Sequence, residues 1–155
     1  KSLQLIHTRI GNIICISSLY ESSSWGYVDD KYINCVLKIK TSFSAFELLK
    51  KTREIETELG RKDKTKIVNS VPNYTSRVTD IDILFYGNEI IHTEDLIIPH
   101  AHIQNRKFIL VPLAEISENL FHPVLKKTAQ TLLEECSDKG TVVKYSEIDL
   151  TRFLH

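Results

Sequence analysis

Residues 32–60 read YINCVLKIKTSFSAFELLKKTREIETELG, and this stretch places a strand directly before a helix. Over 32–40, apolar residues mostly alternate with polar ones, and this period of two is typical of a half-buried strand. A helix is predicted from Ser44, because Ser44 and Glu47 match a capping box. Gly60 is well placed just after the end of that helix. The stretch therefore predicts a domain that contains both helices and strands.

The segments before and after this stretch add further elements. Upstream, apolar residues at helical spacing predict a helix over 3–10, and β-branched residues predict a strand over 13–20. Between that strand and the next, 21–31 has the composition of a polar loop. Downstream, 61–76 lacks apolar periodicity and is predicted to be a long basic loop, which in a compact domain is usually functional or mobile.

The second half of the chain mixes short elements. Residues 78–86 give the strongest strand pattern of the chain, and a turn at Gly87 follows. The remaining expectations are one or two extended segments over 89–98, an apolar segment over 106–118 interrupted by Pro112, a helix over 123–136 and a strand over 141–145.

Helices and strands in this order favour an α+β fold, with a mostly antiparallel sheet covered by helices on one face. A ferredoxin-like arrangement requires one more strand before the first helix. We expect residues 1–155 to form a single domain, because no linker, repeat or low-complexity segment interrupts the chain. The first strand of the ferredoxin-like arrangement is missing from this sequence.

Composition excludes several classes of protein. The 155 residues carry a formal net charge of zero, with 42% hydrophobic and 26% charged side chains. Such a chain can bury enough apolar surface to fold, and it lacks the excess positive charge of a general nucleic-acid binder. The longest apolar run, 108–114, is too short to cross a membrane, and 1–12 does not resemble a secretory signal. We therefore expect neither nucleic acid nor membrane as a partner.

The three cysteines, Cys15, Cys35 and Cys136, are widely separated and have no paired spacing. A disulfide framework or a zinc site would require cysteines or histidines at short intervals. We expect three free thiols that behave as small buried apolar residues, in the reducing cytoplasm.

Asp80 and Asp82 form the first candidate for chemistry. Residues two apart on a strand point to the same face, so both carboxylates project together while Ile81 faces the core. Two neighbouring carboxylates can share a magnesium ion that also binds substrate phosphates. The alternative is an exposed strand face with two solvated acids.

Basic side chains flank this pair. Arg61, Lys62, Lys64 and Lys66 lie in the preceding loop, and Arg77 lies three residues before Asp80. Such cations can neutralise a phosphate chain, although a solvated basic loop has the same composition. Further along, His100 and Arg106 are six residues apart and could both reach a phosphate chain, but His102 leaves the choice of imidazole open.

Aromatic and amide side chains form a further candidate site, which could bind a flat heterocycle. Tyr32 and Asn34 share one face of the predicted strand, and a heterocycle could stack on such a ring while the amide binds its edge. Phe108 is a further aromatic candidate, for which core packing is the alternative. Trp25 could cap such a pocket, and the alternative is an ordinary, partly buried tryptophan. Glu54 and Glu56 lie on the helix after Ser44, where the alternative is a solvated helix face.

Taken together, these stretches resemble the 6-hydroxymethyl-7,8-dihydropterin pyrophosphokinase family. The stretches that carry the resemblance are, in chain order, Ser18-Leu19-Tyr20-Glu21, Trp25-Gly26, Tyr32-Ile33-Asn34, Glu56 with Leu59-Gly60-Arg61, Arg77 with Asp80 to Gly87, Ile98-Pro99-His100, Arg106 with Phe108, and Pro112-Leu113 with Glu115-Ile116. The resemblance implies a ferredoxin-like sandwich with long catalytic loops, and magnesium-dependent transfer of pyrophosphate from ATP to the pterin hydroxymethyl oxygen, releasing AMP, in folate biosynthesis.

The resemblance also implies roles for single residues. Asp80 and Asp82 would hold two magnesium ions, with Arg61 and Arg77 acting beside them in catalysis. The implied pterin-binding set is Ser22, Trp25, Tyr32, Asn34, Glu56 and Phe108, with Tyr32 and Phe108 on opposite sides of the ring. The implied ATP-binding set is Arg61, Arg77, Ile83, His100 and Arg106. We expect a cytoplasmic monomer.

The sequence departs from the family pattern in three places. The family's first strand, with its Gly-Ser-Asn turn, is absent from this sequence. The loop over 62–76 is longer than the common form, and lysines stand where a second arginine is expected after Arg61, without the bidentate fork of arginine. Ser22-Ser23-Ser24 replaces a proline-rich stretch.

Two other functions remain open: a binding module for a small heterocycle, and a nucleotide-sugar transferase that uses the acidic pair for its metal.

Overall fold

The computed structural model describes residues 1–23, 31–60, 79–149 and 152. Its helices are α1 (Ser2–Arg9), α2 (Ala45–Glu58), the 3-10 helix η1 (Ile103–Asn105), α3 (Lys107–Ser117) and α4 (Ala129–Glu135). Its strands are β1 (Asn12–Ile16), β2 (Leu19–Ser23), β3 (Lys31–Asn34), β4 (Leu37–Lys40), β5 (Ile91–His92), β6 (Ile97–Ile98), β7 (Phe121–His122), β8 (Lys127–Thr128) and β9 (Val142–Ser146).

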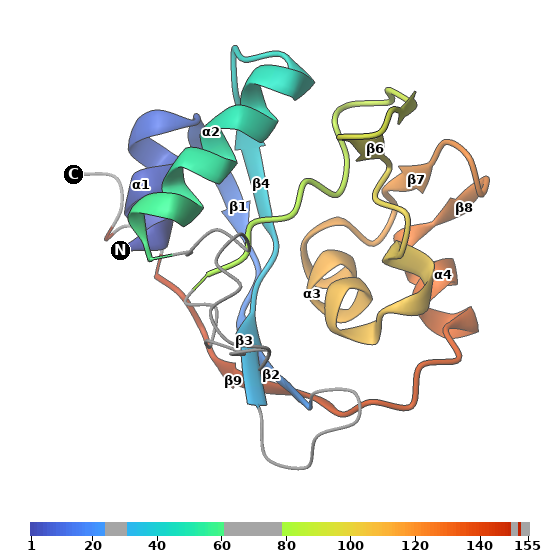
Figure 1. Cartoon of the computed structure of the whole chain (residues 1–155). Coiled ribbons are helices and arrows are strands. Elements are labelled where there is room, and N and C mark those ends of the chain that lie inside the picture. The colour runs from blue at the N-terminus through green and yellow to red at the C-terminus, as the bar shows by residue number, and fades with distance from the viewer. Residues whose placement is uncertain (24–30, 61–78, 150–151, 153–155) are drawn as a thin grey trace, which may run out of the picture.

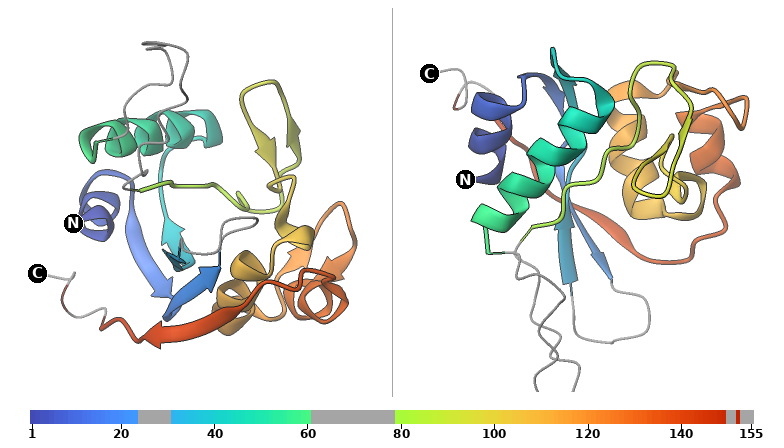
Figure 2. Two further views of the ribbon diagram at one scale, coloured as in Figure 1. Left: turned by 60° about the horizontal axis from the view of Figure 1, so that its bottom comes forward. Right: turned by 45° about the horizontal axis from the view of Figure 1, so that its top comes forward.

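The fold is α+β, and every described strand pair is antiparallel. β1 pairs with β4, β2 lies between β3 and β9, and two short hairpins join β5 to β6 and β7 to β8. The described helices form two groups instead of the expected single layer. α1 and α2 lie together beside β1 and β4, whereas α3 and α4 lie together on the other side of the molecule (Figures 1 and 2).

The predicted strands over 13–20 and 32–40 are each two strands. The break falls where Ser17 and Val36 meet: the Ser17 N–H donates to the Val36 carbonyl, and the Val36 N–H donates to the Ser17 hydroxyl, both at 2.9 Å. Both residues are buried, so these bonds satisfy polar groups that water cannot reach. The first half of each predicted strand and the second half therefore enter different sheets.

The predicted loop over 21–31 is wrong at both of its ends. β2 continues to Ser23 and β3 begins at Lys31, although their residues are mostly polar. β2 has a partner on each side, since it pairs with β3 and with β9. Tertiary pairing overrides local composition here.

The predicted helix around Ser44 is confirmed as α2. The Ser44 hydroxyl accepts from the Glu47 N–H at 3.3 Å, and the Glu47 carboxylate accepts from the Ser44 N–H at 2.8 Å, which completes the capping box. Such a cap stabilises a helix by about 1 kcal/mol. Leu48 and Ile55 of α2 pack against Ile6 of α1, so the helix predicted over 3–10 shares this core.

A strand is absent from 79–86, the described part of the strongest predicted strand. The segment is extended, but none of the described strands pairs with it in a ladder. The predicted alternation is nevertheless present. Ile81 and Ile83 pack against the core formed by α1 and α2, whereas Asp80 and Asp82 are exposed.

The turn and the short strands that follow are confirmed. The Glu89 N–H donates to the Tyr86 carbonyl at 3.0 Å, and Gly87 has a φ of 53°, which glycine adopts without strain. β5 and β6 are the two extended segments predicted over 89–98, and β9 is the strand predicted over 141–145.

The remaining C-terminal elements differ from the prediction. The apolar segment over 106–118 forms α3, which accommodates a buried Pro112 in its interior. The helix predicted over 123–136 begins only at Ala129, because the β7–β8 hairpin precedes it and Thr128 caps it by accepting from the Thr131 N–H at 3.2 Å. After the C-terminal end of α4, the Asp138 carboxylate accepts from the N–H of Lys107, the first residue of α3, at 3.0 Å.

The three cysteines are unpaired, as expected, but each is partly exposed instead of fully buried. Burial raises the pKa of the Cys35 thiol to about 11, so this thiol is protonated at neutral pH. None of the helices in the described part of the chain is long and apolar enough to cross a membrane.

His122 supports a test of stability against pH. Its Nδ1 accepts from the Leu125 N–H at 3.1 Å, and burial lowers the pKa of the imidazole below its ordinary value. A group with a lowered pKa in the folded state stabilises the fold above its unfolded pKa of about 6.5, and this contribution is lost as pH falls. We expect the free energy of unfolding to fall from pH 7 to pH 5, and to fall less in His122→Asn, whose amide oxygen can accept without titrating. Equal pH dependence of the two proteins in denaturant titrations would contradict this.

Candidate active site

Asp80 and Asp82 are held by a buried carboxylate beneath them. The N–H of Ile81, the residue between them, donates to Oε1 of Glu56 at 2.7 Å. Glu56 lies on α2 and is only 3% exposed, so the predicted alternative of a solvated helix face is wrong for this residue. Glu54 is exposed, as that alternative predicts. The buried hydrogen bond fixes the backbone from which both aspartates project.

His100 lies beside this acidic segment. Its N–H donates to the Leu84 carbonyl at 2.9 Å, which ties the residue to the same extended chain as Asp82. Burial lowers the pKa of His100; the negative charge of Asp82 opposes this shift, and the positive charges of Arg106 and His102 reinforce it. The imidazole is therefore neutral at neutral pH, and it lies within electrostatic range of both Asp82 and Arg106.

His102 has a different place from His100. The His102 N–H donates to Nδ1 of His100 at 3.2 Å, and the two rings meet edge to face with centroids 5.9 Å apart. His102 is exposed, whereas His100 is half-buried. This arrangement favours His100 as the imidazole of the site. Its Nδ1 accepts from the His102 N–H, so Nε2 is the ring nitrogen that remains for other contacts.

Arg106 connects the histidine to an aromatic ring. It is the N-cap of α3, and its guanidinium carbon lies 5.8 Å from the centroid of the Phe108 ring. A cation at this distance from a ring face is attracted to it. Phe108 is partly buried against the core formed by α3 and α4, so the helix fixes one edge of this aromatic wall.

Tyr32 and Asn34 lie on β3, a strand that contacts α3. Ser22 of β2 pairs with Tyr32, and the Asn34 amide donates to the Ser22 hydroxyl at 2.9 Å. The bond orients the Asn34 amide, while Tyr32 is 52% exposed and presents its ring. α3 packs against both β2 and β3, so the three residues lie in the same part of the molecule as Phe108.

The structure thus brings together most of the predicted site residues that it describes. Ile83 differs, because its side chain packs among core residues and contributes to stability. Three predicted residues, Trp25, Arg61 and Arg77, lie outside the described residues, as do Lys62, Lys64 and Lys66.

The backbone-binding role of Glu56 was missed at the level of sequence. A signal for it exists in the spacing of α2, where Leu48, Thr52 and Glu56 follow one another at intervals of four and are all buried. An acid on the buried stripe of an amphipathic helix requires a hydrogen-bond partner.

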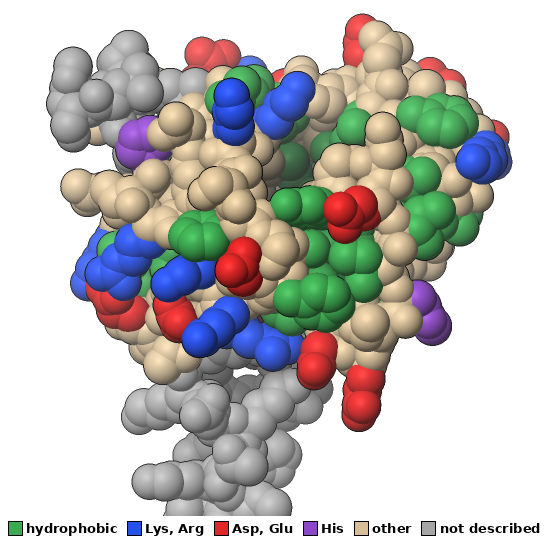
Figure 3. Space-filling model, turned by 90° about the horizontal axis from the view of Figure 1, so that it is seen from above, with side chains coloured by type: hydrophobic (Ala, Val, Ile, Leu, Met, Phe, Trp, Pro, Cys, Tyr) green, Lys and Arg blue, Asp and Glu red, His purple; other side chains and the backbone are tan. Residues whose placement is uncertain are grey.

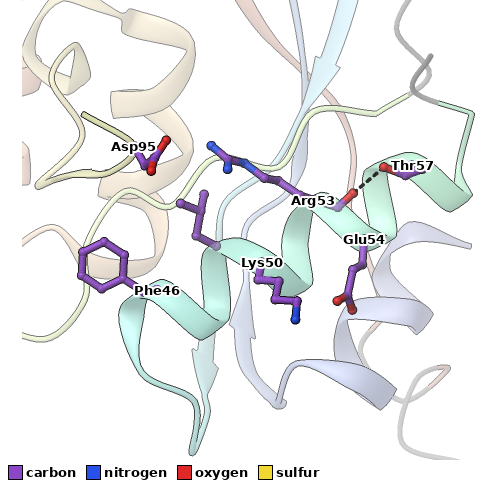
Figure 4. A pocket seen from close by; sticks show the side chains of 7 residues that line it. Phe46, Lys50, Arg53, Glu54, Thr57 and Asp95 are labelled. Carbon is purple, nitrogen blue, oxygen red and sulfur yellow. Dashed lines mark hydrogen bonds between the residues drawn. The ribbon is translucent and has the colours of Figure 1, made fainter. Parts of the chain in front are cut away.

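A separate groove lies on the outer face of α2. Its volume is about 570 Å³, and it is lined by Phe46, Leu49, Lys50, Arg53, Glu54, Thr57 and Asp95. Figure 4 shows the Arg53 side chain extending toward Asp95 across this groove. Among the described residues, none that the family resemblance assigns to the site lines this groove.

Charge on the molecular surface is mixed. On the face in Figure 3, acidic and basic side chains are interspersed with apolar ones and do not form a field of one sign. The described residues on that face thus agree with the formal net charge of zero.

The bond between Glu56 and Ile81 is open to a direct test. Glu56→Ala leaves the Ile81 N–H without its acceptor, and we expect a loss of about 1–3 kcal/mol in the free energy of unfolding. Glu54→Ala is the matched control, because Glu54 is exposed on the same helix and forms only a surface ion pair with Lys51. Chemical denaturation measures both, and equal losses would contradict a special role for Glu56.

Comparison with known proteins identifies the family. The family model described as 7,8-dihydro-6-hydroxymethylpterin-pyrophosphokinase matches residues 1–118. The chain is 42% identical over 113 residues to a 2-amino-4-hydroxy-6-hydroxymethyldihydropteridine pyrophosphokinase of Aquifex aeolicus, covering 72% of this chain and 66% of that protein. It is 40% identical over 122 residues to the protein of that name from Bacillus subtilis, covering 77% of this chain and 69% of that protein.

A longer relative matches as well. The chain is 39% identical over 127 residues to the folic acid synthesis protein fol1 of Pneumocystis carinii, covering 81% of this chain but only 16% of that protein. The chain thus spans about two thirds of its shorter relatives and a small part of this longer one. On these matches, the chain belongs to the 7,8-dihydro-6-hydroxymethylpterin-pyrophosphokinase family.

Proposed function

We propose that this protein transfers pyrophosphate from ATP to the hydroxymethyl group of 6-hydroxymethyl-7,8-dihydropterin and releases AMP, in folate biosynthesis. Family membership supports the proposal, and one observation in the structure carries it. Asp82, His100, Arg106 and Phe108 follow one another in space, each within electrostatic or contact range of the next. This succession supports the proposal that the acidic pair, for a phosphate chain, and the aromatic wall, for a heterocycle, belong to one site.

The phosphate side of the site is built from Asp80 and Asp82. Their carboxylates are hard oxygen ligands on one face of an extended segment, which suits magnesium. Within the described residues, no group of three or more His, Cys, Asp and Glu side chains could hold a metal. Two magnesium ions held at this pair would neutralise the phosphate charge, since magnesium in such sites commonly binds substrate phosphates and water as well.

Cations complete the phosphate side. Arg106 contributes a guanidinium that can bind phosphate oxygens in a bidentate manner. Neutral His100, whose Nδ1 accepts from the His102 N–H, can donate a hydrogen bond from Nε2 without adding charge. Arg61 and Arg77 are proposed to act with them, as nucleotide ligands and in catalysis. A nucleotide contact from Ile83 would come from its backbone, because its side chain belongs to the core.

The pterin side of the proposed site consists of two aromatic rings that stack on the pterin and of polar groups that bind its edge. Tyr32 and Phe108 are proposed to stack on opposite sides of the ring, while Asn34 and backbone groups near Ser22 and Trp25 bind its polar edge. Glu56 is assigned a different part in this proposal. Because it is buried and bonded to Ile81, it acts by positioning the two aspartates.

The reaction then requires positioning and charge neutralisation. The hydroxymethyl oxygen forms a bond to the β-phosphorus of ATP, the bond from that phosphorus to the bridging α-phosphate oxygen breaks, and AMP leaves with that oxygen. The hydroxyl proton passes to a carboxylate or to water. A primary alcohol is a weak nucleophile, so the protein contributes mainly by holding the two substrates in line and stabilising the developing charge.

We propose that residues 1–155 form a single pyrophosphokinase domain with a ferredoxin-like arrangement, acting as a cytoplasmic monomer. The antiparallel strands, with α1 and α2 packed beside β1 and β4, support the fold. The whole activity remains a proposal for this chain, since the match spans about two thirds of the shorter relatives.

Analysis of the nucleotide products tests the function. The protein is mixed with ATP, magnesium and 6-hydroxymethyl-7,8-dihydropterin, and AMP is expected only when all three are present. Formation of ADP would indicate a different transferase. Binding of the pterin without any AMP would favour the heterocycle-binding module.

The acidic pair generates a separate prediction. Asp82→Asn keeps the shape of the side chain and removes its charge, so we expect at least a hundredfold loss of AMP formation, with the thermal midpoint nearly unchanged because Asp82 is exposed. Glu94→Gln, in the exposed turn between β5 and β6, is the matched control and should retain full activity. Normal turnover by Asp82→Asn would exclude the pair as the phosphate site.

A further inference from the structure

Glu115 joins two distant parts of the chain. It lies on α3, and both of its carboxylate oxygens accept from the Ser18 N–H at 3.1 Å. One oxygen also accepts from the Ser18 hydroxyl, and the other accepts from the Tyr20 hydroxyl, both at 2.8 Å. Almost a hundred residues of sequence separate these partners, so the carboxylate closes a long-range contact through four hydrogen bonds.

The position of Glu115 on α3 relates it to the aromatic wall. Phe108 and Glu115 are seven residues apart, which is two turns of an α-helix, so they lie on the same face of α3. Ser18 directly precedes β2 and Tyr20 belongs to it. Glu115 therefore attaches to β2 the helix face that carries Phe108.

β2 in turn sets the position of the opposite wall. Tyr20 pairs with Asn34 and Ser22 pairs with Tyr32, and the Asn34 amide donates to Ser22 at 2.9 Å. Any movement of β2 against α3 would move Tyr32 and Asn34 relative to Phe108. A stacking site between two rings tolerates little such movement, because its contacts weaken within a fraction of an ångström.

The charge states of Glu115 and Tyr20 favour a stable connection between α3 and β2 at neutral pH. Burial raises the pKa of Glu115, but hydrogen bonds from Ser18 and Tyr20 and the charge of Lys144 outweigh it and lower the pKa overall. Burial and the same carboxylate raise the pKa of Tyr20 to about 12. At neutral pH the pair is thus a carboxylate and a neutral phenol, which is the combination that forms a strong hydrogen bond.

We infer that Glu115 is a positioning residue of the pterin site: by binding Ser18 and Tyr20, it fixes the distance between the wall that carries Phe108 and the wall that carries Tyr32 and Asn34. It touches neither substrate in this assignment, and it acts through β2 and α3. The inference rests on the proposed function and adds a residue to the pterin side alone. Asp80 and Asp82 are held by a separate contact, because the Ile81 N–H between them donates to Glu56 on α2.

The test uses Glu115→Gln and Tyr20→Phe, with Glu118→Gln as the matched control. Glu118 is an exposed acid at the C-terminal end of the same helix, and its side chain has no hydrogen bond to the described part of the chain. Titration calorimetry gives the Kd for the pterin, steady-state kinetics give the KM for each substrate, and thermal unfolding gives the Tm.

We expect Glu115→Gln to raise the Kd and the KM for the pterin about three- to tenfold, the effect of weakening one charge-assisted cluster, while the KM for ATP stays within about twofold. Tyr20→Phe should act in the same direction and less strongly, since it removes one of the four bonds. It also keeps the test valid if Glu115→Gln does not fold. Glu118→Gln should match the wild type in all three measurements.

The alternative is that Glu115 only stabilises the fold. A lower Tm with both KM values and the pterin Kd unchanged, in Glu115→Gln or in Tyr20→Phe, would overturn the inference. Equal weakening of ATP and pterin binding would overturn it as well. If the wild type binds no pterin, the proposed function fails and the assignment of Glu115 fails with it. Wild-type pterin binding with an unchanged Kd in the variants overturns only the assignment of Glu115.

Discussion

The hydrogen bond from the Ile81 N–H to the buried Glu56 is the interaction on which the acidic site depends. The segment 79–86 is extended, and no strand of the described chain completes a ladder with it. Its placement therefore relies on this bond, on the His100 N–H that donates to Leu84, and on the packing of Ile81 and Ile83. A buried carboxylate is costly without hydrogen-bond donors, and the Ile81 N–H supplies one to Glu56.

α3 connects the two halves of the proposed site. Arg106 lies at its N-terminus beside His100, Phe108 lies in its first turn, and Glu115 lies two turns later, against β2. A helix is stiff over this length, so a single element relates the phosphate side to the pterin side. Pro112 lies between these residues and is fully buried, which anchors the middle of the helix in the core formed with α4.

Local patterns predicted what depends on neighbours in sequence, and they failed where distant contacts decide. The capping box of Ser44 and Glu47 and the alternation around Asp80 and Asp82 are both present, because each involves residues a few positions apart. The break at Ser17 could not be predicted, since it depends on Val36 across the sheet. The late start of α4 and the burial of Glu56 likewise depend on tertiary partners. The family resemblance supplied the roles of single residues, which no spacing in the chain establishes.

The acids near this site fall into two physical kinds. Glu56 and Glu115 accept hydrogen bonds from backbone N–H groups and from hydroxyls, so their lone pairs are used in holding segments together. Asp80 and Asp82 are exposed on one face, where solvent and ligands can reach them. In sequence these are simply carboxylates near apolar residues. Glu56 is buried, whereas Glu115 is exposed like the two aspartates, so hydrogen-bond partners rather than burial set Glu115 apart. In the proposed site, the buried Glu56 thus supports the backbone from which the exposed aspartates project toward a ligand.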